Sequence, residues 1–289
     1  MPISSSKSVG PGRRMTDVQV TVMTHDRSAS LARLLESLDR QCDRERVDIT
    51  ILDNGSAEPH ATEVRQTAAR HGATVLRSER NLFVAGKRVL EDDVFARTRP
   101  DVLVRLDDDV ILEDGWLEAV LAVLDTGVAA CGSVENHDGD LAISGQRTFE
   151  FTNEIINGKA VKIWDWRWHE PDRTAVSEQV ELAGQRALAV DGRAAFHVRH
   201  DPAFLIGGED ADYSLRLRHA GHEIRIARSA MIRHRTLGER DVAGYRVAEN
   251  VIPSWRHFYR RWGFIRRSAA DEAGMPLEAF VAAVVGTRR

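Results

Sequence analysis

Strand-like and helix-like patterns of apolar residues alternate along the first hundred residues. Short apolar runs typical of buried strands occur at 18–24, 47–56, 73–78 and 102–106. Segments with apolar residues at helical spacing lie between them, at 28–38, 59–71 and 84–97. This alternation predicts an α/β fold, with a Rossmann-like, mostly parallel sheet and helices on both of its faces.

The second half of the chain is less regular. A helix at 114–125 and a strand at 127–132 extend the pattern, but 133–180 is an irregular, polar, tryptophan-bearing stretch. An acid-rich helix at 209–220 and a strand at 223–227 follow, and the last fifty residues have a helical pattern. We therefore divide the chain into a disordered tail (1–16), two α/β halves (17–112 and 113–240) and a C-terminal helical segment (241–289).

Composition narrows the classes of partner and compartment. The formal net charge of −4 provides no basic field for a nucleic acid, so no such partner is expected. Two cysteines, Cys42 and Cys131, are too few for a disulfide scaffold or a cysteine-rich zinc site and favour a reducing cytoplasm. No stretch approaches the ~18 apolar residues of a membrane span, so any membrane contact is expected to be peripheral.

Polar residues stand where the predicted strands end. Thr24 and Asp26 follow the first strand, Asp53 the second, and the sequence LDDDV (106–110) the fourth. Because parallel α/β sheets bind ligands at the carboxyl ends of their strands, these positions predict a ligand site at one edge of the sheet. Taken alone, Asp53 before an Asn-Gly pair is more typical of a simple turn than of a ligand contact.

The three consecutive aspartates can serve a metal. Alternate residues of an extended chain point to the same side, so Asp107 and Asp109 can share one side while Asp108 points elsewhere. Two carboxylates at a strand end suit Mg²⁺ or Mn²⁺ bridging to a diphosphate. The alternative is a solvated turn that caps the following helix.

A second acidic group follows a diglycine in GGEDADYSLRLR (207–218). Glu209 and Asp210 can supply a general base within reach of a hydroxyl group. The structural alternative is that acids at a helix N-terminus are favoured by the helix dipole. His234 is isolated in sequence, and a lone histidine is more often a surface or core residue than a ligand.

Two aromatic segments each have two interpretations. In WDWRWH (164–169), Trp164, Trp166 and Trp168 can offer indole faces to flat ligands such as sugar rings, or form a hydrophobic cluster that anchors a loop. SWRHFYRRWGFIRR (254–267) can touch an anionic membrane or a lipid-linked ligand, or pack as a core helix with a solvated basic face. No GxxxxGK[ST] loop and no GxGxxG after the first strand occur, which argues against a P-loop ATPase and a Rossmann dehydrogenase.

Six segments in order resemble the family 2 glycosyltransferases, which have the GT-A fold, and rhamnosyltransferase-type members above all. The segments are VTVMTHDR with LARLLESL, ILDNGS, NLFVAGKR, LDDDV, GGEDADYSLRLRHAGHEI and AMIRH. They run from about residue 18 to 236. The resemblance implies a metal-dependent, inverting transfer of a sugar from a nucleoside-diphosphate donor (UDP, dTDP or GDP) to a hydroxyl of a glycan, a lipid-linked or a small natural-product acceptor. Residues 17–112 would then bind the donor and 113–240 the acceptor.

The resemblance also implies residue roles. Nucleotide-side contacts would come from Thr24, Asp26, Asp53, Arg80, Lys87, Arg88, Asp107 and Asp108. Asp107, Asp109 and His234 would hold Mn²⁺ or Mg²⁺, and Asp210, paired with Glu209, would be the catalytic base. The three tryptophans would form the acceptor platform.

The chain departs from the family pattern at two places. Phe83 stands where family members often carry a glycine, and AFLIGGEDADYSL shortens the spacing before the acidic helix. Two competing hypotheses remain open. A sugar nucleotidyltransferase would show a Gly-rich, basic loop after the first strand, where this chain has THDRSAS. A non-catalytic sugar-binding protein would not need Asp210 for its function.

Overall fold

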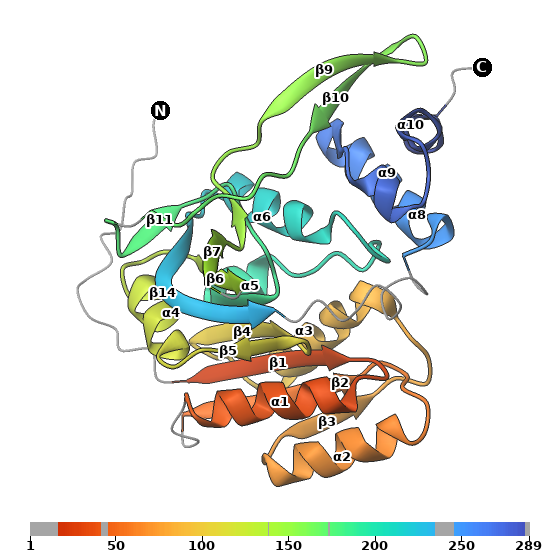
Figure 1. Ribbon diagram of the computed structural model, residues 1–289. Helices are drawn as coiled ribbons and strands as arrows, with labels where there is room; N and C mark the ends of the chain where they lie inside the picture. The colour runs from red at the N-terminus through yellow and green to blue at the C-terminus, as the bar shows by residue number, and fades with distance from the viewer. Residues whose placement is uncertain (1–16, 42–45, 138, 173, 235–245, 287–289) are drawn as a thin grey trace, which may run out of the picture.

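The structure is a computed structural model that describes residues 17–41, 46–137, 139–172, 174–234 and 246–286. The predicted disordered tail, 1–16, lies outside the described residues. Ten strands of the described chain form one sheet in the order β11-β14-β6-β13-β4-β1-β2-β3, with β5 paired to β14 and β7 to β6 (Figure 1). The predicted α/β class is confirmed.

The half of the sheet from β4 to β3 is parallel. Its strands are β1 (Val18–Thr24), β2 (Val47–Asp53), β3 (Thr74–Arg77) and β4 (Val102–Asp107). The other half mixes directions: β13 is antiparallel to β4 and β6, while β14 is parallel to β6. Its strands are β5 (Val110–Leu112), β6 (Ala130–His137), β7 (Asp140–Ile143), β11 (Ser177–Gln179), β13 (Ala187–Asp191) and β14 (Ile224–His234). A separate strand pair joins β8 (Gly145–Gln146) and β12 (Leu182–Ala183).

Helices cover both faces of the sheet. One buried cluster packs α1 (Ser28–Asp39), α2 (His60–Arg70) and α4 (Trp116–Leu124) against one face. Leu31, Leu34, Leu35 and Leu38 of α1 are fully buried there, as their helical spacing predicts. A second cluster packs α3 (Gly86–Arg97), α5 (Gly192–His197) and α6 (Glu209–His219) against the other face.

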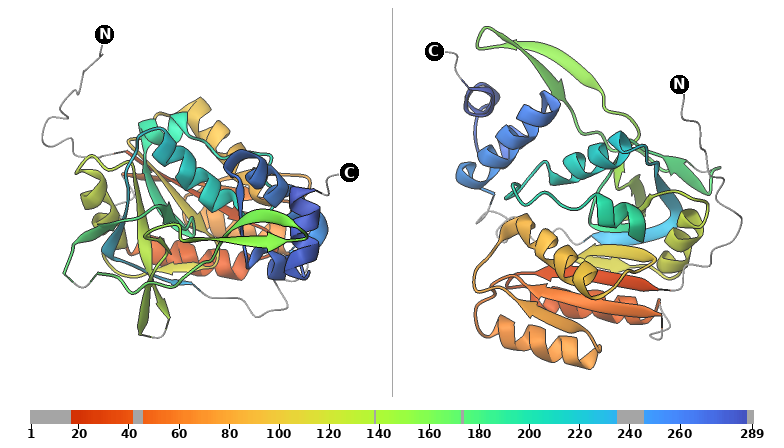
Figure 2. Two further views of the ribbon diagram at one scale, coloured as in Figure 1. Left: turned by 90° about the horizontal axis from the view of Figure 1, so that it is seen from above. Right: turned by 180° about the vertical axis from the view of Figure 1, so that it is seen from behind.

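A third cluster builds an additional layer beyond the sheet. It joins the hairpin of β9 (Phe151–Ile156) and β10 (Lys159–Trp164) to α8 (Ala248–Trp262), β15 (Phe264–Arg266), α9 (Ala269–Glu272) and α10 (Leu277–Val285). Both figures show this hairpin beside the three C-terminal helices, away from β1–β3 (Figures 1 and 2). The expectation of an irregular stretch at 133–180 is therefore wrong for the hairpin at 151–164, and also where β6, β7, β8 and β11 lie in that range. Among the described residues, every helix is too short or too polar to cross a bilayer.

Candidate active site

Acidic side chains from β4 and from the start of α6 meet around one lysine. Lys87, in the first turn of α3, places its Nζ 3.5 Å from Oδ1 of Asp107 at the end of β4. Burial acts to lower the pKa of Lys87, but the carboxylates of Asp107, Asp210 and Glu209 outweigh it and raise that pKa. Lys87 is thus a charged group held between Asp107 and the Glu209–Asp210 pair.

Two glycines set the start of α6. Gly207 and Gly208 have φ angles of +83° and +84°, in the left-handed region that glycine adopts without steric cost. A Cβ on Gly207 would also lie 2.9 Å from Nε1 of Trp255. The diglycine is therefore required by the turn, and this turn directs Glu209 and Asp210 towards Lys87.

The three aspartates after β4 have different partners. Asp108 is buried, and its Oδ2 accepts a 2.6 Å hydrogen bond from Oγ1 of Thr24. Burial and the neighbouring Asp109 raise the pKa of Asp108 to about 7. Asp108 and Thr24, both predicted to contact the nucleotide, are thus hydrogen-bonded to each other inside the protein. Arg27, which the sequence analysis missed, lies 3.4 Å from Asp108 and 3.1 Å from Asp109.

Asp109 and His234 form the part of the site best suited to a metal ion. Nε2 of His234 lies 3.4 Å from Oδ1 of Asp109 across the pairing of β14 with β5. Apart from this contact with His234, that buried oxygen has no hydrogen-bond partner among the described residues. Burial acts to raise the pKa of Asp109, but His234 and Arg27 lower it below its ordinary value.

The donor set fits Mn²⁺ or Mg²⁺ only in part. Carboxylate oxygens suit both ions, and an imidazole is compatible with Mn²⁺. Within the described residues, no group of three or more His, Cys, Asp or Glu side chains is arranged around one metal position. Asp107 lies at the rim, with its side chain 38% exposed, and interacts electrostatically with Asp109 and His234. A metal held here would therefore need further oxygen ligands from substrate and water.

The acidic pair on α6 has free acceptor oxygens. Oδ2 of Asp210 accepts a 3.4 Å hydrogen bond from the backbone N–H of Gln185. Oδ1 of Asp210 and Oε2 of Glu209 are buried without a hydrogen-bond partner among the described residues. Burial and the charge of Asp210 raise the pKa of Glu209 to about 7. One carboxylate of the pair is thus free to accept a proton from a ligand.

The residues predicted to contact the nucleobase have unequal exposure. Asp53 is fully buried: Oδ1 accepts from the N–H of Ser56 at 2.9 Å, and Oδ2 pairs with Arg77. The side chain of Arg77 is 43% exposed and covers this carboxylate. Asp26 is 41% exposed, with one oxygen accepting from the N–H of Ala57 at 2.7 Å. Arg77 and Asp26 are therefore the groups presented to solvent, and the sequence analysis missed Arg77.

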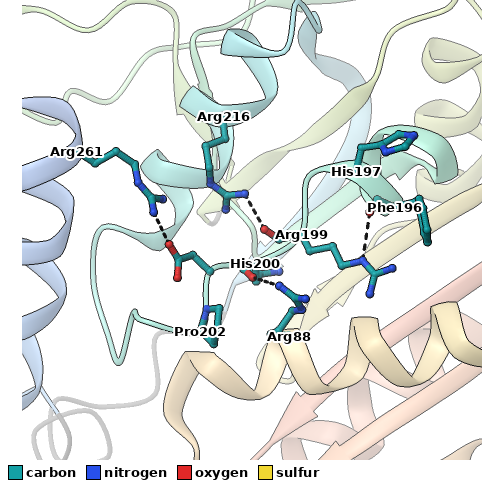
Figure 3. A pocket seen from close by; sticks show the side chains of 9 residues that line it. Arg88, Phe196, His197, Arg199, His200, Pro202, Arg216 and Arg261 are labelled. Carbon is teal, nitrogen blue, oxygen red and sulfur yellow. Dashed lines mark hydrogen bonds and ion pairs between the residues drawn. The ribbon is translucent and has the colours of Figure 1, made fainter.

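The predicted basic residues do not act together. Unlike its neighbour Lys87, Arg88 points to a separate pocket, where it pairs with Asp92 and donates to the backbone oxygen of His200 (Figure 3). Arg80 is exposed. Phe83, in place of the glycine frequent in the family, has a φ of +52°, so the chain keeps a backbone conformation that glycine adopts most readily.

The tryptophans divide between a buried cluster and the surface. Trp164 is 1% exposed and packs edge-on against Phe149 at 4.8 Å between ring centroids, so its faces are not available to a ligand. Trp166 follows at 5.9 Å from Trp164, and Trp168 at 6.3 Å from Trp166. Trp168 is 59% exposed. The cluster interpretation therefore describes Trp164, and Trp168 alone keeps a largely open ring.

The sheet, with carboxylates from β4 and from the start of α6 around Lys87, defines an α/β protein with a candidate site at this edge. The sequence model of glycosyl transferase family 2 matches residues 19–177, more than half of the 289 residues. The chain belongs to this family. No curated protein sequence matches it.

Solved structures share the GT-A-like fold. GalNAc-T7 with UDP, GalNAc and Mn²⁺ has a TM-score of 0.64 and 16% identity, over 96% of this chain and 55% of that one. The mannosyltransferase PcManGT from Pyrobaculum calidifontis, in complex with GDP-Man and Mn²⁺, has a TM-score of 0.59 and 15% identity, over 97% and 79%. TarS 1-349 of S. aureus has a TM-score of 0.54 and 11% identity, over 93% and 69%. The chain thus spans little more than half of the GalNAc-T7 chain.

Proposed function

We propose that the protein transfers a sugar from a nucleoside-diphosphate donor to an acceptor hydroxyl, with inversion at the anomeric carbon and with Mn²⁺ or Mg²⁺. One observation carries the proposal: the Asp107–Asp109 edge of β4 faces the Glu209–Asp210 start of α6 across Lys87. Family membership supports it, as do the UDP and GDP-Man ligands named for two of the similar structures. Rhamnosyl or other hexosyl specificity stays a prediction.

The proposed reaction is a single displacement. The acceptor oxygen forms a bond to the anomeric carbon while the bond from that carbon to the diphosphate breaks, and its electron pair leaves with the diphosphate. Asp210 accepts the hydroxyl proton on its Oδ1, which is buried and makes no hydrogen bond to a described residue.

The leaving diphosphate is negatively charged, and positive charge to stabilise it would come from the β4 edge of the site. Asp109, His234 and Asp107 would hold the metal, which when bound neutralises charge on the diphosphate. Lys87 adds a fixed positive charge at the same edge. Negative charge develops on the departing diphosphate during the transfer, so we expect its stabilisation to be a large electrostatic contribution to catalysis.

The acceptor remains a glycan, a lipid-linked glycan or a small natural product. Trp168 is the exposed ring that supports an acceptor contact. Peripheral membrane contact and a cytoplasmic location are further proposals, motivated by the basic aromatic segment 254–267 and by the scarcity of cysteine. The buried aromatic side of α8, with Trp255 and Phe258 fully covered, favours packing for that face of the segment.

The donor site is tested by thermal unfolding with UDP, dTDP or GDP, each with Mn²⁺, with Mg²⁺ and with EDTA. A ligand at ~100 times its dissociation constant adds ~2.7 kcal/mol of stability. We expect one diphosphate to stabilise the protein only with metal, and Asp109→Ala to abolish the shift. Asp125→Ala, an exposed carboxylate after α4, is the matched control and should keep it.

Two outcomes would redirect the assignment. If no diphosphate stabilises the protein under any condition, the nucleotide-sugar site is wrong and the non-catalytic alternative gains support. If a nucleoside triphosphate with a sugar 1-phosphate yields pyrophosphate, the protein is a nucleotidyltransferase instead. Transfer itself is followed as release of the nucleoside diphosphate from the stabilising donor class.

A further inference from the structure

A pocket of about 560 Å³ lies apart from the candidate active site, between α3, α5, α6 and α8 (Figure 3). Four arginines from four parts of the described chain line it. They are Arg88 on α3, Arg199 after α5, Arg216 on α6 and Arg261 on α8. The chain as a whole is acidic, so this local concentration of positive charge calls for an explanation.

The guanidinium of Arg199 is fixed in place. Its Nη1 pairs with Asp92 at 2.5 Å and its Nε donates to the backbone oxygen of Phe196 at 3.2 Å. The same group lies over the rings of Phe95 and Phe196, at 4.7 and 4.8 Å from their centroids. Such stacking and pairing remove conformational freedom before any ligand arrives, which favours binding.

Arg88 and Arg216 are held in the same manner. Arg88 donates from Nε to Asp92 at 2.8 Å, and Arg216 from Nε to Asp212 at 2.7 Å. Each uses Nη1 for a backbone oxygen, of His200 and of Arg199 respectively. In all three arginines, Nη2 makes no hydrogen bond to any described residue. Three N–H₂ groups on residues that line the pocket therefore have no protein partner among the described residues.

The charges do not balance inside the pocket. The four arginines pair with three carboxylates, those of Asp92, Asp201 and Asp212. One positive charge is left over, together with the three free Nη2 groups. A compact oxyanion that accepts several hydrogen bonds at once fits this arrangement, since guanidinium groups bind phosphate with directional, charge-assisted hydrogen bonds.

A second cavity of about 290 Å³ shares Phe196 and His197 with the first. The charged residues that line it are two arginines, Arg99 and Arg193, and two aspartates, Asp101 and Asp191, so their charges cancel. A ligand that reaches from the first cavity into the second would therefore place an anionic end among the arginines and a neutral, polar part beside Phe196.

We propose that this pocket binds the phosphate group of a phosphate monoester, at a site separate from the donor site. The inference does not depend on the proposed sugar transfer, because none of the acids around Lys87 lines either cavity. The phosphate contacts Nη2 of Arg88, Arg199 and Arg216, and the esterified polar group extends towards Arg193.

The test is isothermal titration calorimetry with inorganic phosphate and with sn-glycerol 3-phosphate, in buffer that contains EDTA to remove divalent metal ions. Arg216→Gln is the main variant, because Asp212 then keeps Arg261 at 2.7 Å and Nε1 of Trp262 at 3.0 Å as partners. We expect it to bind both probes at least tenfold more weakly, which is ~1.4 kcal/mol. The matched control is Arg65→Gln, which removes an exposed arginine of α2 and should bind as the wild type does.

Binding that is equal in Arg216→Gln and the wild type, or absent in the wild type, overturns the proposal. If Arg216→Gln does not fold, Arg88→Gln takes its place, since Asp92 keeps Arg199. Equal affinity for the two probes overturns the assignment of an ester. Asp109→Ala separates the two sites: it should bind phosphate normally even if no nucleotide binds, and loss of phosphate binding there would assign the anion to the donor site and refute the separate pocket.

Discussion

A buried ion pair beneath the candidate active site offers the sharpest test of the structure. Glu91 on α3 and Arg105 on β4 are 2% and 5% exposed, and their charged groups lie 2.6 Å apart. Glu91 stands one helical turn after Lys87, and Arg105 stands two residues before Asp107. The pair therefore fixes α3 to β4 directly beneath the Lys87–Asp107 contact.

The contribution of this ion pair to the free energy of unfolding can be estimated from the pKa of Glu91. Burial acts to raise the pKa of Glu91, but Arg105 and His200 outweigh it and lower the pKa from 4.5 to about 2. A difference of ~2.5 units corresponds to ~3 kcal/mol in favour of the charged form. Removing one member leaves the other charged and buried, for which losses of ~3–5 kcal/mol are typical. We expect Glu91→Gln and Arg105→Met each to cost ~3 kcal/mol or more.

A double-mutant cycle in urea, extrapolated to water, measures the coupling. The double variant leaves no unpaired charge, so its loss should fall short of the sum of the single losses by ~2–3 kcal/mol. The single variants should also weaken donor binding, because α3 is no longer fixed to β4. Asp93→Asn, which breaks the exposed pair with Arg97, is the control and should cost under ~0.5 kcal/mol. Additive losses, or single losses below ~1 kcal/mol, would refute the reasoning.

Three further predictions address catalysis, the pH dependence of stability and the glycine turn after β2. Asp210→Asn should lower kcat by ~10²–10⁴ with the diphosphate-induced thermal shift retained, and unchanged turnover would remove Asp210 as the base. Burial, with Arg105, lowers the pKa of His200 from 6.5 to about 4. The neutral imidazole therefore contributes its full stability above pH 6.5, and this contribution is lost as pH falls. Urea titrations should show ~2 kcal/mol lost from this group between pH 6.5 and 5, and His200→Gln should flatten that slope. Gly55→Ala should cost ~2 kcal/mol in urea unfolding, since its φ is +79° and the new Cβ would lie 2.4 Å from the carbonyl carbon of Arg80. Gly72→Ala is the control, with a φ of +61° but open space, and an equal loss in both would mean that the clash contributes nothing.

The regular elements of the fold could be predicted because their signals are local. The first strand, predicted at 18–24, is β1, and the acid-rich helix predicted at 209–220 is α6. The hairpin at 151–164 was missed, although it carries a turn signal. Asn157 and Gly158 both have positive φ angles, 51° and 72°, as the two-residue turns of hairpins require. Its apolar residues do not alternate cleanly along the strand, since Ile155 is 75% exposed next to the buried Ile156.

The sequence predicts at which strand ends and helix start the site lies, but not which side chains contact one another there. That the acids of β4 and of α6 are functional candidates follows from strand ends and a helix start. That Asp53 is covered by Arg77, or that Arg27 reaches two aspartates, depends on residues brought together across 24 to 82 positions of sequence. No periodicity encodes such pairs. Trp164 and Trp168 show the same limit, since identical residues four positions apart have opposite burial.

Two adjacent residues of α3, Lys87 and Arg88, have different surroundings that their sequence positions do not reveal. Lys87 and Arg88 are neighbours in one helix, where consecutive side chains point about 100° apart. One therefore faces the carboxylates of the candidate active site and the other the arginine pocket. The resemblance to the family assigns Lys87 and Arg88 the same nucleotide-side role, whereas the helix directs their side chains to different places. Arg88→Gln should accordingly weaken phosphate binding in the pocket and leave metal-dependent diphosphate binding intact, and Lys87→Gln should do the reverse; titrating both variants with both ligands decides whether these neighbours belong to one site or two.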